Sequence, residues 1–184
     1  IMYMKRALKG DLGRSILSDL PVLKEVTTRF LNTLQLAFWA MLLATILGLL
    51  AGVISATRPY SKFDYSCMTG SLLGISMPSF WFGLMLMGFF SVYFKWLPAG
   101  GKGTAAHLVM PVLTLGLTGA GIVARMTRST MLEIISSEYI TTARSKGVSD
   151  GKVNYLHALK NALLPVITVV GLQSGYLLGG SVIT

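Results

Sequence analysis

Four long runs without a charged residue constrain this chain more than any other feature of its sequence. Each run exceeds the roughly 20 residues that a helix needs to cross a bilayer. Because the hydrocarbon core offers no hydrogen-bonding partner to the backbone, each run should be helical. The sequence therefore predicts an all-α membrane protein built as a polytopic helical bundle. The runs are Phe30–Thr57, Tyr65–Phe94, Gly103–Ala124 and Asn161–Thr184.

Composition supports the same class of protein. Hydrophobic residues make up 53% of the 184 residues and charged residues only 12%, whereas a soluble domain carries about 25% charged residues. The net charge of +9 lies between the apolar runs, where anionic lipid headgroups account for it better than nucleic acid does. The single cysteine, Cys67, excludes an internal disulfide and a cysteine-rich metal site.

The distribution of basic residues does not decide which loops face the cytoplasm. If the polar stretch after Ala124 is cytoplasmic, residues 58–64 are cytoplasmic as well, and residues 1–29 and 95–102 are external. Each side then carries eight Lys and Arg residues. The positive-inside rule therefore favours neither orientation of the chain in the membrane.

The stretch Glu138–Pro165 is the longest polar interruption in the second half of the chain. It predicts two short helices, the first ending at a left-handed Gly147 and the second capped by Ser149 with Asp150 in its first turn. An apolar face on the second helix is expected from residues at helical spacing. Such a helix–turn–helix suits docking to a partner protein, and an amphipathic loop resting on lipid headgroups is the alternative. The apolar face comprises Val153, Leu156, Leu159 and Leu163.

This stretch resembles the cytoplasmic EAA loop of permease subunits in binding-protein-dependent ABC importers. Glu138, Ala143, Gly147 and Leu164-Pro165 stand in the roles of its Glu-Ala-Ala start, its glycine and its Leu-Pro. The gap of eighteen residues from Gly147 to Pro165 exceeds that of the general loop. It is similar to the dipeptide, oligopeptide and nickel branch, with its Ala-Arg-x-Lys-Gly and His-Ala-Leu-x-Asn-Ala-Leu-Leu-Pro.

Further segments from Gly10 to Thr184 resemble the same family. They include an external segment, the opening of a span, a Ser-x-Pro-x-Phe segment, an external Leu-Pro-x-x-Gly turn and an Ala-Arg-x-x-Arg-Ser entry to the coupling loop. In this chain they are Gly10–Ser15, Asn32–Leu34, Ser76–Phe80, Trp96–Gly101 and Ala124–Ser129.

The resemblance implies an ABC importer type-1 transmembrane domain over residues 30–184, in a bacterial or archaeal cytoplasmic membrane. Its spans are expected at about residues 30–57, 66–94, 104–124 and 162–184, with a cytoplasmic coupling loop at 125–161. Residues 1–29 would be an external segment that follows a missing first span. Because the chain opens on Ile1 and closes on Thr184 inside an apolar run, both ends are expected to be truncated, with one more span on each side.

The implied function is that of a permease subunit moving peptides, nickel or similar small solutes. Its implied partners are ATP-binding cassette ATPase subunits, a second permease subunit and an extracytoplasmic solute-binding protein, besides membrane lipid. The alternative is a non-transporting membrane scaffold or small channel whose basic loop contacts lipid. The resemblance assigns ATPase coupling to Glu138, Ala143, Arg144, Lys146, Gly147, Ser149, His157 and Pro165.

The chain itself is not expected to be an enzyme. Around Gly101-Lys102-Gly103 the Ser or Thr of a Walker A motif is missing, so ATP hydrolysis belongs to the partners, and no cofactor is expected. His107 and His157 lie 50 residues apart without metal-ligand spacing, so no metal site is expected. Polar residues within the spans are candidates for the translocation path, namely Ser76, Pro78, Ser79, Gln173 and Ser174.

Glycine spacing and proline positions predict how the spans pack and bend. Pro78 should break the second visible helix near mid-span, because it removes a backbone donor. Small residues four apart should let helices approach closely. These sets are Gly48 and Gly52; Gly70 and Gly74; Gly116, Ala120 and Ala124; and Gly171, Gly175 and Gly179.

Overall fold

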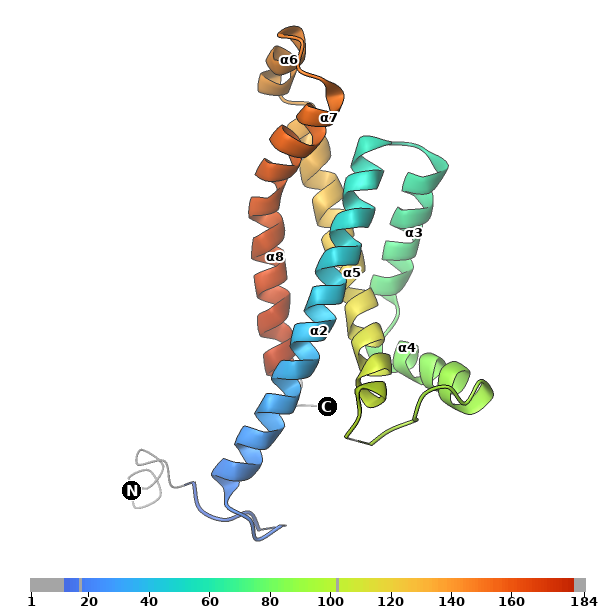
Figure 1. Ribbon diagram of the computed structural model, residues 1–184, viewed down its shortest axis with the longest axis vertical. Coiled ribbons are helices and arrows are strands. Elements are labelled where there is room, and N and C mark those ends of the chain that lie inside the picture. The colour runs from blue at the N-terminus through green and yellow to red at the C-terminus, as the bar shows by residue number, and fades with distance from the viewer. Residues whose placement is uncertain (1–11, 17, 102, 181–184) are drawn as a thin grey trace.

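The computed structural model describes residues 12–16, 18–101 and 103–180, and these residues form an elongated bundle of helices (Figure 1). Gly10 and Asp11, which open the predicted external motif, Lys102 and residues 181–184 lie outside the described residues. The elements are α2 (Val22–Thr57), α3 (Lys62–Ser76), α4 (Ser79–Leu86), the π-helix η1 (Met87–Tyr93), α5 (Ala105–Ile135), α6 (Glu138–Ser145), α7 (Asp150–Lys152), the π-helix η2 (Val153–Ala158) and α8 (Leu159–Gly180).

Three helices of the described residues are long and apolar enough to cross a membrane, which confirms the predicted all-α polytopic class. They are α2, α5 and the continuous helix Asp150–Gly179, and the bent pair α3 with α4–η1 would make a fourth span. Some helices extend beyond the predicted spans, and α2 begins at Val22 instead of about residue 30. The helix α5 continues past Ala124 to Ile135, and the last span is already helical from Asp150.

The pair α2 and α5 forms the centre of the bundle. A β-carbon on Gly48 would lie 2.5 Å from the β-carbon of Val123, and one on Gly116 would lie 3.1 Å from the carbonyl oxygen of Ala40. Glycine therefore brings the two backbones together, as the spacing in these two helices predicts. The other predicted glycine faces make no such close approach among the described residues. A β-carbon on Gly74 would lie 3.8 Å from the carbonyl oxygen of Leu117, an ordinary contact, and no described atom lies within 4 Å of one on Gly70, Gly171, Gly175 or Gly179.

The second predicted span is not one straight helix. The axis turns by 104° between Lys62–Ser76 and Ser79–Tyr93. Met77 has an extended backbone with φ −79° and ψ 129°, and Pro78 precedes α4 with φ −58° and ψ 132°. A proline disfavours the helical conformation of the preceding residue and cannot supply the next helical donor. The predicted break at Pro78 is confirmed, whereas Pro111 and Pro165 lie inside α5 and α8.

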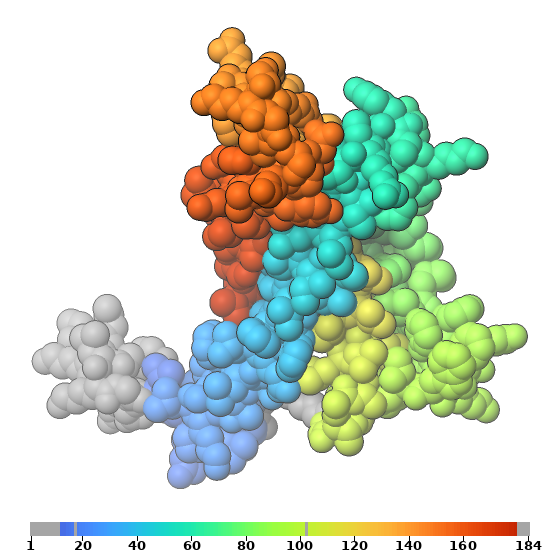
Figure 2. Space-filling view, turned by 45° about the horizontal axis from the view of Figure 1, so that its top comes forward, coloured from blue at the N-terminus to red at the C-terminus, as the bar shows by residue number. Residues whose placement is uncertain are grey.

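The two ends of the bundle carry different elements. The short helices α6 and α7 lie at one end, with the turn between α2 and α3 near the same end (Figure 1). The helix α4, the start of α5 and the start of α2 lie toward the other end. The space-filling view shows α6–α7 and the α4–η1 segment projecting at opposite ends (Figure 2).

Candidate functional site

The α6–η2 unit, residues 138–158, comprises the short helices that project from one end of the bundle (Figure 1). It contains most of the residues predicted to couple to an ATPase. Three features define its geometry: a left-handed turn at Gly147, a hydrogen-bonded contact between α6 and η2, and an apolar base against α2 and α5.

Gly147 ends α6 in the left-handed region, with φ 81°, as predicted. The amide of Gly147 donates to the carbonyl of Arg144 at 2.9 Å, and the amide of Val148 donates to the carbonyl of Ala143 at 3.2 Å. This pair of bonds is a Schellman motif, which satisfies carbonyls that the helix end would otherwise leave unpaired. Ala143 thus acts through its carbonyl oxygen.

The start of the next helix also follows the prediction. Ser149 precedes α7 with an extended backbone, and Asp150 lies in the first turn. The hydroxyl of Ser149 makes no capping bond. Arg144 Nε instead lies 3.2 Å from Asp150 Oδ1, across the turn, although both side chains are substantially exposed. An exposed pair of this kind contributes little stability, so the turn depends mainly on its backbone.

Tyr139 connects α6 to the helix that follows the turn. Its hydroxyl donates to the carbonyl of His157 at 3.3 Å and accepts from Asn161 Nδ2 at 2.8 Å. Asn161 Nδ2 also lies 3.0 Å from the same His157 carbonyl. His157 therefore contributes its backbone carbonyl oxygen to this contact. Sequence reasoning did not select Tyr139 or Asn161 as site residues, because neither carries charge or motif spacing typical of a site.

The base of the unit is apolar and fully buried. Ile140, Val153 and Ala158 are 0% exposed. Ala158 packs in a cluster with Met131 of α5 and Val53 of α2, and the cluster also contains Ala56 and Ala162. The unit is consequently anchored to the two central helices.

The predicted apolar face of the second helix is wrong at Leu156, which is 60% exposed. The π-helix Val153–Ala158 adds a residue to the turn, so the buried positions run from Val153 to Ala158, five residues on, and then to Ala162 and Val166. A repeat of five residues shifts the helix face relative to the α-helical spacing used for the prediction. Tyr155 and Leu156 therefore face outward.

The remaining predicted coupling residues lie at the surface or along α8. Glu138 is in the first turn of α6, where a carboxylate is favoured by the helix dipole. Glu138 and Lys146 are exposed. Pro165 is half-buried within α8, one turn beyond Asn161, rather than at a helix boundary.

The predicted translocation residues are divided between the α3–α4 bend and α8. Ser76 and Ser79 flank the bend at Pro78. On α8, Ser174 Oγ donates to the carbonyl of Val170 at 2.8 Å, and Gln173 Oε1 would lie 3.3 Å from a β-carbon on Gly119. The amide nitrogen of Gln173 is buried and makes no hydrogen bond within the part of the chain that the structure describes.

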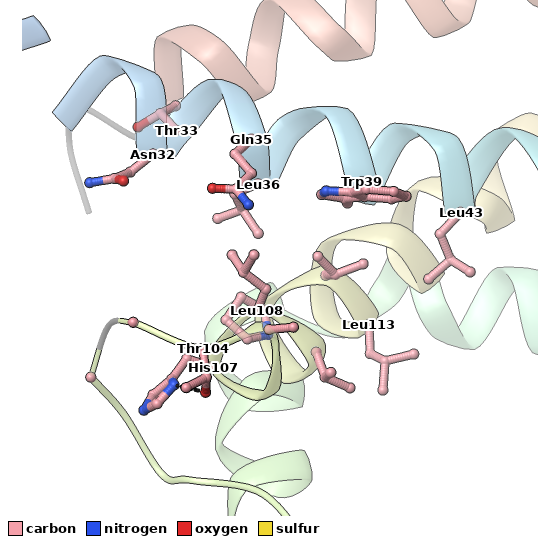
Figure 3. A pocket seen from close by; sticks show the side chains of 16 residues that line it. Asn32, Thr33, Gln35, Leu36, Trp39, Leu43, Thr104, His107, Leu108 and Leu113 are labelled. Atoms are coloured by element: carbon pink, nitrogen blue, oxygen red, sulfur yellow. Dashed lines mark hydrogen bonds between the residues drawn. The ribbon is translucent and has the colours of Figure 1, made fainter. Parts of the chain in front are cut away.

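A cavity of about 910 Å³ lies at the opposite end of the bundle, between α2 and the start of α5, and none of these five residues lines it. Gln35, Leu36 and Trp39 of α2 face Leu108 and Leu113 of α5 across it (Figure 3). His107 is held at its rim, with Nδ1 2.7 Å from the hydroxyl of Thr104. No spacing in the sequence identifies these residues as one surface.

A family described as "Binding-protein-dependent transport system inner membrane component" matches residues 48–184. Similar proteins include a dipeptide transport system permease protein DppB from Alkalihalophilus pseudofirmus, 41% identical over 100% of this chain and 63% of its own length. The glutathione transport system permease protein GsiC from Escherichia coli is 43% identical over 98% of this chain and 59% of its length. A di/tripeptide transport system permease protein DppB from Pseudomonas aeruginosa is 41% identical, over 99% and 62%. The chain thus spans about three-fifths of these relatives.

Proposed function

This chain belongs to the family of inner membrane components of binding-protein-dependent transport systems, and on that premise we propose that it is part of the permease subunit of an ATP-driven importer for peptides. The three relatives named above carry dipeptide, glutathione and di/tripeptide transport in their names. Their agreement favours short peptides over nickel among the solutes of this branch.

The α6–η2 unit carries the proposal. It consists of short helices joined by the turn at Gly147, which backbone hydrogen bonds close, and it lies at one end of the bundle within the residues that the family matches. Its outer surface presents Tyr155 and Leu156, and its inner surface is anchored on α2 and α5. Such a unit suits insertion of a helical element into a groove of a partner protein.

In this proposal the α6–η2 unit and the α2–α3 turn face the cytoplasm, and α4 and the cavity between α2 and α5 face outward. Two ATP-binding cassette ATPases dock inside, a solute-binding protein delivers peptide outside, and a second permease completes the pathway. Residues 30–184 form the type-1 transmembrane domain. Energy reaches this chain only through differential contacts in two states of the complex.

Reconstitution of the full-length protein with its ATPase and second permease in proteoliposomes tests the proposal. Labelled dipeptide and purified binding protein are supplied on the side opposite the ATPases. We expect peptide uptake that requires both ATP and the binding protein. Flux without ATP would identify a small channel, and failure of the purified protein to retain an ATPase would support a membrane scaffold.

A further inference from the structure

An ion pair between a partly exposed Arg128 and a buried Asp64 joins α3 to α5 at the same end of the bundle as the α6–η2 unit. Arg128 Nε lies 2.6 Å from Asp64 Oδ1, and Arg128 Nη2 lies 2.7 Å from Asp64 Oδ2. Asp64 is 1% exposed, and the two residues are 64 positions apart. Two parallel bonds between a planar guanidinium and a carboxylate fix the relative orientation of the groups as well as their distance.

The Asp64 carboxylate also holds the turn between α2 and α3. The amide of Tyr60 donates to Asp64 Oδ2 at 2.9 Å, and the amide of Asp64 donates to Ser61 Oγ at 3.2 Å. Tyr60 adopts φ 62°, an uncommon conformation for a residue with a side chain. One carboxylate, at the start of α3, therefore ties the α2–α3 turn to α5.

Arg128 is close along α5 to the residue that supports the α6–η2 unit. Met131, three residues further on, is 0% exposed and packs with Ala158 of η2 and Ala162 of α8. The same stretch of α5 therefore contacts η2 and α8 through Met131, and the α2–α3 turn through Arg128. If a displacement of η2 moves α5, the Arg128–Asp64 contact can transmit that movement to α3.

Stability alone gives a weak reason for this pair. A buried ion pair can often be replaced by apolar side chains of similar size without loss of stability. Ionisable residues in apolar segments are costly, and a bidentate pair adds a fixed orientation that an apolar contact lacks. This contact thus differs from ordinary packing because it fixes the orientation of α3 relative to α5.

We propose that Asp64 and Arg128 are positioning residues that make the α2–α3 turn follow the end of α5 when the α6–η2 unit is displaced. The inference rests on the proposed function, in which that displacement comes from ATPase subunits. In the intact pair, movement of α5 reorients α3. Without the pair, the ATPases still bind the complex and hydrolyse ATP. A smaller part of the movement of α5 in each cycle is then transmitted to α3 and so to the transport pathway.

The test compares ATP hydrolysed per peptide imported in the reconstituted full-length complex. The variants are Asp64→Asn, Arg128→Gln and the apolar double variant Asp64→Leu with Arg128→Met. Lys62→Gln and Arg125→Gln are the matched controls, since they remove exposed charges from the same turn of α3 and the same part of α5. Membrane levels and ATPase retention are measured for every variant.

We expect all three pair variants to assemble and to raise the ratio of ATP to peptide by about two- to thirtyfold, the range of coupling changes along a physical network, with both controls unchanged. A wild-type ratio in the single variants would overturn the inference. A wild-type ratio in the apolar double variant alone would also do so, because an unpaired charge would then be the cause. Loss of all three from the membrane would assign the pair a folding role instead. A wild-type complex without uptake would overturn the proposed function, and this inference with it.

Discussion

Gly52 and Thr127 bring the backbones of α2 and α5 into direct contact. A β-carbon on Gly52 would lie 2.5 Å from the β-carbon of Thr127 and 2.7 Å from the carbonyl oxygen of Ala124. Neither atom is the end of a flexible side chain, so the helices must separate to accept it. We expect Gly52→Ala to lower the free energy of unfolding by about 1–3 kcal/mol, as overpacking does.

Thermal unfolding in detergent measures this effect. Gly70→Ala is the matched control, because no atom lies within 4 Å of a β-carbon there. Adding Thr127→Ala to Gly52→Ala should not restore stability, because the β-carbon of residue 127 remains. Equal melting temperatures for Gly52→Ala and Gly70→Ala would show that α2 and α5 are further apart than described.

Gly147 is the position in the α6–η2 unit where a side chain should be least tolerated. Its φ is 81°, and no atom lies within 4 Å of a β-carbon there. Gly147→Val is therefore opposed by backbone strain of about 1–2 kcal/mol rather than by a clash. We expect reduced ATPase retention and reduced peptide uptake, with normal membrane insertion. Gly151→Ala, on α7 with similar open space, is the control, and normal uptake in Gly147→Val would refute a coupling role for the turn.

Removal of one hydroxyl should loosen α6 without disturbing the bundle. Tyr139→Phe eliminates the bonds to the His157 carbonyl and the Asn161 amide. A hydrogen bond contributes about 1 kcal/mol net, so amide hydrogen exchange in α6 should accelerate about fivefold. Tyr155→Phe alters an outward-facing tyrosine and should leave exchange unchanged. Equal protection of α6 in both variants would mean that the apolar base alone holds it.

The bend at Pro78 should depend on the proline ring. In Pro78→Ala, Met77 is free to adopt the helical conformation that a following proline disfavours. Spin labels at Lys62 and Tyr93, in a Cys67→Ser background, should report a longer and broader distance, while insertion stays normal and peptide uptake falls. Pro111→Ala in α5 serves as the control. An unchanged distance would show that the packing of α4 against α5, and not the proline ring, maintains the bend.

The two ends of the bundle should lie on opposite sides of the membrane. Ala99→Cys lies in the loop before α5 and Ser149→Cys in the α6–η2 unit, and both positions are exposed. In the Cys67→Ser background, a membrane-impermeant thiol reagent added to intact cells should label residue 99 alone. The reagent should label residue 149 only after the membrane is permeabilised. Labelling of both in intact cells would contradict the orientation proposed for the chain.

The main helices and the turn at Gly147 were predictable because their causes are local. Absence of charge over Phe30–Thr57 indicates a span, and a glycine after an amphipathic segment indicates a left-handed stop. The extension of α5 to Ile135 was not predicted, since Arg125 and Arg128 suggested the end of a span. Arg128 is accommodated by Asp64, a partner 64 residues away that no local pattern reveals.

The interior of the α6–η2 unit was predictable only in part. Periodicity assumes a constant number of residues per turn, and η2 departs from that number, so Leu156 was placed on the wrong face. Tyr139 and Asn161 meet only because the turn at Gly147 folds α6 back on η2. Their contact depends on tertiary structure, and the sequence carried no signal for it.

The continuous helix Asp150–Gly179 has a mechanical consequence. Its 30 residues extend for about 45 Å at the usual rise per residue. Because one continuous helix joins the α6–η2 unit to the far end of α8, the segment can act as a stiff lever. Pivoting it by about 10° around one end would carry the other end through about 8 Å at that length. A small rotation at one end of the bundle is thereby amplified into a movement of several ångströms at the other end.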